Sequence, residues 1–172
     1  MSGLTFGLDN LTNFITNTTN NALNLANDTI AQINTQLLTG SATLNLGAAG
    51  FISVNVPVGP GVTLNLPSNT GTMLALLDPV HFQGTINFYV PGGAPPGGLP
   101  SQVQLTGVPA DSWAFANNTL TLFAGGKPTD TVKMVPDPVG FGVYATPNGA
   151  VVSSSPVIAA LPPSVVPLPG QL

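Results

Sequence analysis

The sequence has almost no charge. Only 5% of its 172 residues are charged, against about 25% in ordinary soluble domains. It has no Arg and no Glu, and its cations are Lys127 and Lys133. Two lysines cannot neutralise a run of phosphates, so we expect neither nucleic-acid binding nor attraction to an anionic membrane.

Cysteine is absent, which excludes disulfides and thiolate chemistry. No apolar run approaches the roughly 20 residues of a membrane helix, so we expect no membrane insertion. The first ten residues lack the basic start and apolar stretch of a secretory signal. We expect an extracellular or cell-surface protein, exported by a non-classical route or with its signal already removed. A virion protein is the alternative.

Catalytic motifs are also absent. No G-x-S-x-G sequence exists, no close pair of acids is present, and no phosphate-cradling glycine motif occurs. His81 is the only histidine, so no standard zinc or transition-metal cluster can form. Its neighbours Val80 and Phe82 indicate a partly buried, hydrogen-bonded structural residue. We therefore predict that the protein is not an enzyme.

Calcium is the one metal that the composition leaves open, because it binds carboxylate and carbonyl oxygens. Asp111 precedes Asn117 and Asn118, and Asp130 and Asp137 lie further along. These spacings match no familiar calcium loop, and acids that cap backbone amides in turns explain them better. We predict no cofactor, with calcium as the alternative.

Residues 1–40 predict an amphipathic N-terminal helix, because apolar residues recur at a three-four spacing over 8–38. Its polar face is mostly Asn and Thr, which cost roughly half a kcal/mol each relative to Ala in a helix. Such a helix needs packing, either on its own sheet or on other copies. The expected assembly contacts are Leu8, Leu11, Ile15, Ile30, Ile33 and Leu37.

Residues 41–155 predict a mainly β domain, an antiparallel β-sandwich or jelly roll, with a small barrel as the alternative. About eight segments alternate apolar residues with Asn, Ser, Thr or Gln, and short Gly- and Pro-rich turns separate them. Short connections predict antiparallel pairing. The residues expected to face one side are Leu44, Leu46, Val54, Val56, Leu64, Leu66, Ile86, Phe88, Val103, Leu105, Leu120 and Leu122.

The tetrapeptide TLNL recurs at 43–46 and 63–66, with SVNV between the two copies. No regular continuation follows, so we interpret the segments as a meander of similar strands and not as a true repeat.

Residues 156–172 predict an extended Pro-rich arm. Five prolines rule out a helix or a central strand. The arm is nevertheless apolar, and we expect it to lie in a groove of its own domain or of a neighbouring copy. Its expected contacts are Val157, Ile158, Leu161, Val165, Val166 and Leu168.

These features together predict a structural protein that assembles with copies of itself into an extracellular filament, a surface layer or a capsid-like array. Uncharged Asn- and Thr-rich faces hydrogen-bond across a contact without burying unpaired charge. The alternatives are a secreted carbohydrate-binding module and a viral decoration or fibre protein. In the binding module, Trp113, in a segment read as a loop, would stack on a sugar.

Overall fold

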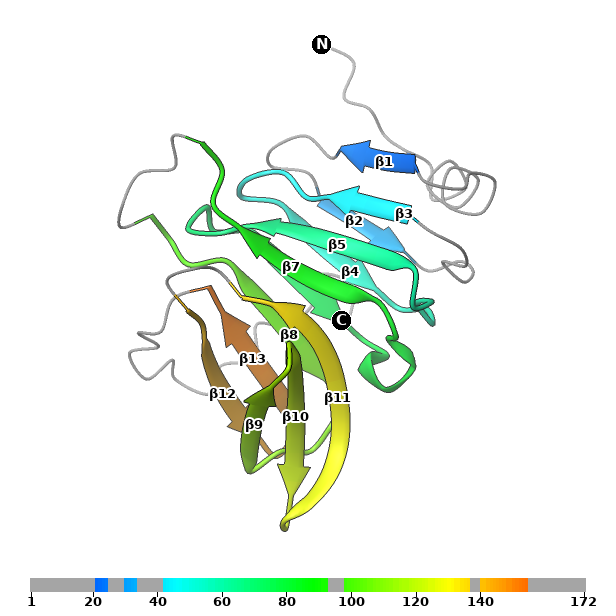
Figure 1. Ribbon diagram of the computed structural model, residues 1–172, viewed down its shortest axis with the longest axis vertical. Coiled ribbons are helices and arrows are strands. Elements are labelled where there is room, and N and C mark those ends of the chain that lie inside the picture. Colours follow the sequence, from blue (N-terminus) through cyan, green and yellow to red (C-terminus); the bar gives the residue numbers. More distant parts are fainter. Residues whose placement is uncertain (1–20, 25–29, 34–41, 93–97, 137–139, 155–172) are drawn as a thin grey trace, which may run out of the picture.

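The computed structural model describes residues 21–24, 30–33, 42–92, 98–136 and 140–154. These residues form two mixed β-sheets that lie one behind the other (Figure 1). The front sheet has the strand order β1-β3-β5-β7-β11-β10-β9, and the back sheet has the order β12-β13-β8-β6-β4-β2. The mainly β prediction is confirmed.

The first eight strands alternate between the two sheets. They are β1 (Asn21–Asn24), β2 (Ile30–Ile33), β3 (Ala42–Asn45), β4 (Phe51–Val54), β5 (Val62–Pro67), β6 (Met73–Leu76), β7 (Thr85–Tyr89) and β8 (Gln102–Thr106). Odd-numbered strands pair in parallel in the front sheet and even-numbered strands pair in parallel in the back sheet. The chain therefore winds as a flattened coil with two strands in each turn, here called the parallel half.

The remaining five strands form the antiparallel half. They are β9 (Ser112–Ala116), β10 (Thr119–Ala124), β11 (Lys127–Val135), β12 (Gly142–Thr146) and β13 (Gly149–Ser153). A two-residue turn with positive φ at Asn117 and Asn118 joins β9 to β10, as tight hairpins require. β11 pairs in parallel with β7, and β13 pairs antiparallel with β8, so each sheet runs through both halves.

One hydrophobic core fills the space between the sheets and includes residues of both halves. All twelve side chains expected to face one side are buried there, which confirms the alternation argument. Leu64 and Leu122, one from each half, are both 0% exposed.

A small buried polar cluster also connects the two halves. The Ser101 hydroxyl donates to the carbonyl of Pro67 at 2.6 Å and accepts from the Thr72 amide at 3.2 Å. The Ser101 amide donates to the hydroxyl of Ser154, which follows β13, at 3.0 Å. Because buried polar atoms need partners, these serines tie the turns of the coil to the last strand.

Two expectations about the β domain are wrong for the parallel half: antiparallel pairing of its strands, and the absence of a true repeat. Each short connection in this half leads to a strand of the opposite sheet, and the chain then returns to the first sheet. Neighbouring strands of one sheet are therefore joined through a strand of the other sheet and run parallel. The TLNL segments belong to a structural repeat. Asn21 is opposite Ala42, Ala42 is opposite Val62, and Thr63 is opposite Thr85, which are intervals of 21, 20 and 22 residues.

Of residues 1–40, for which a helix was predicted, the structure describes only 21–24 and 30–33. The structure has strands, β1 and β2, at 21–24 and 30–33, where a helix was expected. Ile30 and Ile33 are therefore the two ends of a strand in the back sheet, where they pair with Phe51 and Val54. The rest of 1–40 lies outside the described residues.

The other predicted assembly contacts also lie outside the described residues. These are Leu8, Leu11, Ile15, Leu37 and the whole arm, 156–172. Among the residues that are described, no helix has the length and hydropathy needed to cross a bilayer.

Candidate functional site

Two ranks of identical polar residues cross the front sheet of the parallel half. Register places Thr43, Thr63 and Thr85 side by side on β3, β5 and β7. Two residues along each strand, a second rank runs through Asn45, Asn65 and Asn87. We call these six residues the ladder face. All six are half-buried, and their strands alternate them with core residues, so they point away from the core.

The asparagines of the ladder face are hydrogen-bonded to one another. The Asn65 amide Nδ2 donates to Oδ1 of Asn45 at 2.5 Å, and Nδ2 of Asn87 donates to Oδ1 of Asn65 at 2.9 Å. β1 places Asn24 at the next register position beyond Asn45. An amide ladder of this kind fixes each side chain and supports the parallel register.

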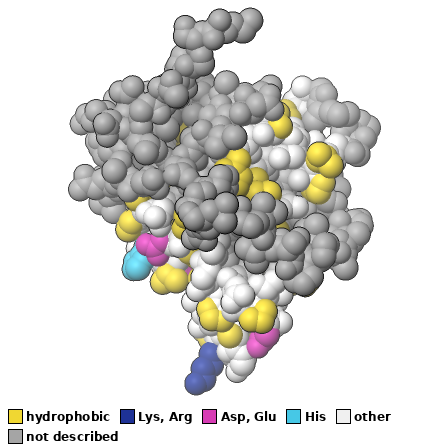
Figure 2. Space-filling model, turned by 180° about the vertical axis from the view of Figure 1, so that it is seen from behind, with side chains coloured by type: hydrophobic (Ala, Val, Ile, Leu, Met, Phe, Trp, Pro, Cys, Tyr) yellow, Lys and Arg dark blue, Asp and Glu magenta, His cyan; other side chains and the backbone are white. Residues whose placement is uncertain are grey.

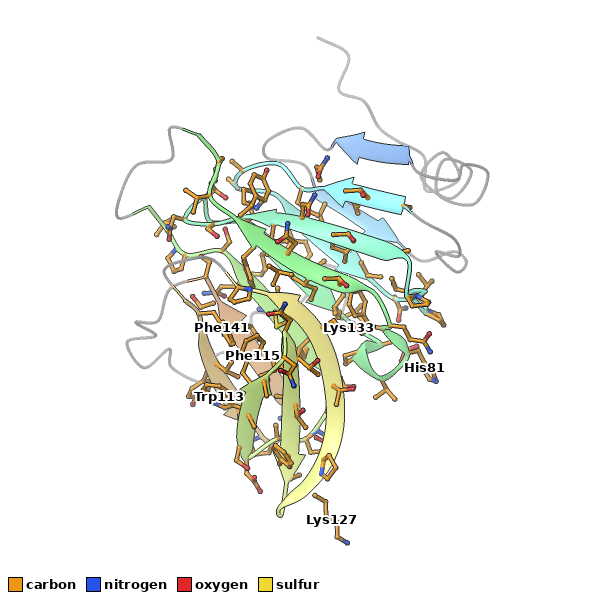
Figure 3. All side chains as sticks on the ribbon, in the orientation of Figure 1. His81, Trp113, Phe115, Lys127, Lys133 and Phe141 are labelled. Atoms are coloured by element: carbon orange, nitrogen blue, oxygen red, sulfur yellow. The ribbon has the colours of Figure 1, made fainter. Side chains whose placement is uncertain are left out.

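The ladder face carries no charge and is bordered by a cationic, an aliphatic and an aromatic residue. On β11, Lys133 continues the threonine rank beside Thr85, and Val135 continues the asparagine rank beside Asn87. Tyr89, 36% exposed, lies two residues beyond Asn87 and so on the same side of β7. Figure 3 shows the side chains of these strands on the front of the sheet.

Trp113 lies in strand β9 and not in a loop, so that expectation is wrong. Its ring is 43% exposed and its centroid is 6.2 Å from that of Phe141. Phe115 meets Phe141 edge to face, with centroids 4.7 Å apart. Figure 3 shows the three rings gathered beside β9 and β12. Trp113 thus partly covers the side of the sandwich while keeping some of its surface in solvent.

β9 is an edge strand with unusual exposure. Among the strands that the structure describes, it pairs only with β10, and it ends the front sheet. Four of its five residues are exposed, and Phe115 is half-buried. The strand contains no charged residue, proline or glycine. Natural edge strands are usually protected by charged residues or proline, and β9 has neither.

His81 is paired but not buried. The short 3-10 helix η1 (Pro79–His81) turns its ring toward Asp78, and Nδ1 lies 2.8 Å from a carboxylate oxygen of that residue. The expected hydrogen bond is confirmed. The expected burial is wrong, because the His81 side chain is 66% exposed. Seen from behind, the cyan histidine lies against a magenta acidic side chain at one side of the molecule (Figure 2).

A cavity of about 410 Å³ lies between η1, the residues after it and β11. Its lining includes Val80, Phe82, Asp130 and Lys133. Burial raises the pKa of the Asp130 carboxyl, and the nearby Asp78 charge acts in the same direction against the hydrogen bond from the Thr131 amide. Oδ2 of Asp130 is buried and has no hydrogen-bond partner among the residues that the structure describes.

Asp111 caps a turn. Its carboxylate accepts from the Gly125 amide at 2.6 Å and from the Ser112 hydroxyl at 2.7 Å. These hydrogen bonds, the one from Gly125 first, lower the pKa of Asp111. Asp137 lies outside the described residues. Among the residues described, no group of three or more acidic or histidine side chains could hold a metal ion.

The ladder face and the β9 edge were not predicted from the sequence. The sequence does contain a signal for the ladder face, because Thr-x-Asn occurs at 43–45, 63–65 and 85–87 with nearly equal spacing. Of the predicted assembly and stacking residues, Trp113 is the one whose exposure the structure describes. No protein-family model and no curated protein matches this chain.

Proposed function

We propose that the chain is a non-enzymatic structural subunit that assembles with copies of itself through pairing of exposed β-strands. The assembly would be a filament, a surface layer or a capsid-like array outside the cell. The observation that carries this proposal is the open edge of β9, which is uncharged and exposed on both sides of the strand.

Two copies would join most simply by antiparallel pairing of β9 with β9 around a two-fold axis. The two seven-stranded sheets would then form one continuous sheet, since main-chain hydrogen bonds give such contacts their affinity. Ala114, the middle residue of β9, would lie close to its equivalent in the other copy. Trp113 and Phe141 beside the edge supply aromatic surface of the kind that is enriched in interfaces.

A two-fold contact alone gives a closed dimer, so an array needs a second contact. Within the described residues, β1 ends the same sheet at the opposite side and pairs only with β3. Two open edges on opposite sides of one sheet allow copies to add in both directions. Low charge favours this, because few like charges repel adjacent copies.

The test uses Ala114→Lys, with Asn55→Lys as the matched control on an exposed residue after β4. Like charges directly opposite each other destabilise strand pairing, so Ala114→Lys should weaken association by about tenfold or more, equal to about 1.4 kcal/mol. Asn55→Lys should assemble as the unchanged protein does. Light scattering across a dilution series, with negative-stain images of the same samples, measures the effect.

A wild-type protein with the mass of a single chain at every concentration would overturn self-assembly. Equal assembly by wild type and Ala114→Lys would place the contact elsewhere than β9.

A further inference from the structure

We propose that the ladder face binds a neutral, hydroxyl-rich polysaccharide. The inference is independent of the β9 contact, because the six ladder residues lie on β3, β5 and β7 and none lies on the β9 edge.

The chemistry of the face selects the class of partner. Threonine hydroxyls and asparagine amides each donate and accept hydrogen bonds, as sugar hydroxyls do. The threonine hydroxyls of the ladder make no hydrogen bond within the part of the chain that the structure describes, so they are available to a ligand. The six residues include no cation that would attract an anionic polymer.

The geometry favours a polymer over a single sugar. Neighbouring strands of a sheet lie about 4.8 Å apart, and alternate residues along a strand are about 6.6 Å apart. Each rank therefore offers the same group three times at regular steps. A polymer that repeats its hydroxyls can make the same contact at successive strands, and linked weak contacts add to a useful affinity.

The face is also held ready for binding. The hydrogen bonds between Asn45, Asn65 and Asn87 fix the amides before any ligand arrives. Threonine is stiff at χ1 because it is β-branched. Little side-chain freedom is then lost on binding, which is one of the main costs of association.

Tyr89 supplies the stacking surface that sugars use. It lies at the end of β7 on the same side as Asn87 and is 36% exposed. An aromatic ring packs on the apolar face of a sugar, while its hydroxyl remains free to hydrogen-bond. A second copy of the chain fits the ladder face less well, because stable protein contacts have an apolar centre and these six residues provide none.

The experiment is co-sedimentation of the full chain with insoluble cellulose, chitin and a linear β-1,3-glucan, with anionic alginate gel as the charge control. The wild-type protein should sediment with at least one neutral polymer, with little dependence on salt, and not with alginate. Thr63→Arg places a bulky charge at the centre of the face and should reduce this binding by about tenfold or more, about 1.4 kcal/mol. Tyr89→Ala, which leaves the ladder intact, should also weaken it.

The matched control is Thr121→Arg. It makes the same substitution on the outer side of the same sheet, in β10, where Thr121 is half-buried between core residues. It should bind as wild type does, and circular dichroism should show that all variants fold. Ala114→Lys should keep polysaccharide binding, and Thr63→Arg should keep the assembly mass, so the failure of one proposal does not imply failure of the other.

Absence of wild-type binding to all three neutral polymers would overturn the inference. Equal binding by Thr63→Arg and wild type would do the same. A change in assembly mass with Thr63→Arg, without a change in polysaccharide binding, would show that the face is a contact between copies and not a glycan site.

Discussion

The two halves of the molecule use one core but specify their sheets differently. In the parallel half, each strand pairs with the strand one full turn later, and like residues meet across the pairing. In the antiparallel half, strands pair with sequence neighbours through tight turns, as β9 does with β10 and β12 does with β13. Register comes from side-chain ranks in the first half and from turn geometry in the second.

This difference explains where the two proposed surfaces lie. Stacked turns make an ordered face with repeated chemistry, which suits a repetitive ligand. A hairpin meander leaves its outermost strand, β9, with an edge to which no other described strand pairs, and such an edge suits pairing with another chain. Each of the two proposed surfaces therefore follows from the winding of its own half.

The largest effect on stability is expected from creating a cavity in the shared hydrophobic core. Leu64→Ala in the parallel half and Leu122→Ala in the antiparallel half each remove a fully buried side chain. Each should lower the free energy of unfolding by about 2–5 kcal/mol. Urea unfolding followed by Trp113 fluorescence and by far-UV circular dichroism measures the loss.

Because one core cluster contains both leucines, the two probes should report a single transition in both variants. Trp113 lies in the antiparallel half, so its fluorescence would depart from circular dichroism if the halves unfolded separately. Two separate transitions after Leu64→Ala would show that the halves are independent units.

A smaller effect is expected from breaking the amide ladder. Asn65→Ala removes the central member, which donates to Asn45 and accepts from Asn87. The cost should be about 1–3 kcal/mol, because half-buried partners lose their hydrogen bonds. The control is Thr121→Ala, which removes a half-buried side chain from the outer side of β10 in the antiparallel half, where no amide ladder exists among the described residues. It should change the free energy of unfolding by no more than about 0.5 kcal/mol. Equal losses in the two variants, measured by urea unfolding, would show that the ladder adds nothing.

The smallest effects concern pH, where Asp130 and Asp111 should behave in opposite ways. The pKa of Asp130 is raised in the folded protein, chiefly by burial, so its protonated form favours folding and that contribution is lost as pH rises through the folded pKa. Asp130→Asn should therefore make the protein slightly more stable at neutral pH than wild type.

The pKa of Asp111 is lowered, chiefly by the hydrogen bond from the Gly125 amide. Its contribution is present above the unfolded pKa and is lost as pH falls through the folded pKa. Asp111→Asn should lower stability at neutral pH and flatten the acid limb of the curve. Thermal melting of both variants from neutral to acidic pH checks the signs, and a change of the same sign in both would contradict them.

The sequence predicted the core well, but it could not predict which strands pair. The alternation of apolar and polar residues predicts that Leu64 and Leu120 are buried, whichever strands lie beside them. This two-residue period depends only on the sequence of the strand itself. It does not say whether the next strand lies in the same sheet. β6 gives no alternating signal, because Leu74, Ala75 and Leu76 are all buried. β9 was missed because its exposed residues resemble a loop.

The winding of the parallel half limits how its length can change. Removal of a single residue within β5 would turn Leu64 outward and the ladder residues inward. Removal or duplication of one complete turn, 20 to 22 residues here, takes or adds one strand in each sheet and leaves every remaining pair in register. Insertions and deletions that preserve the fold of this half are therefore those that contain whole turns.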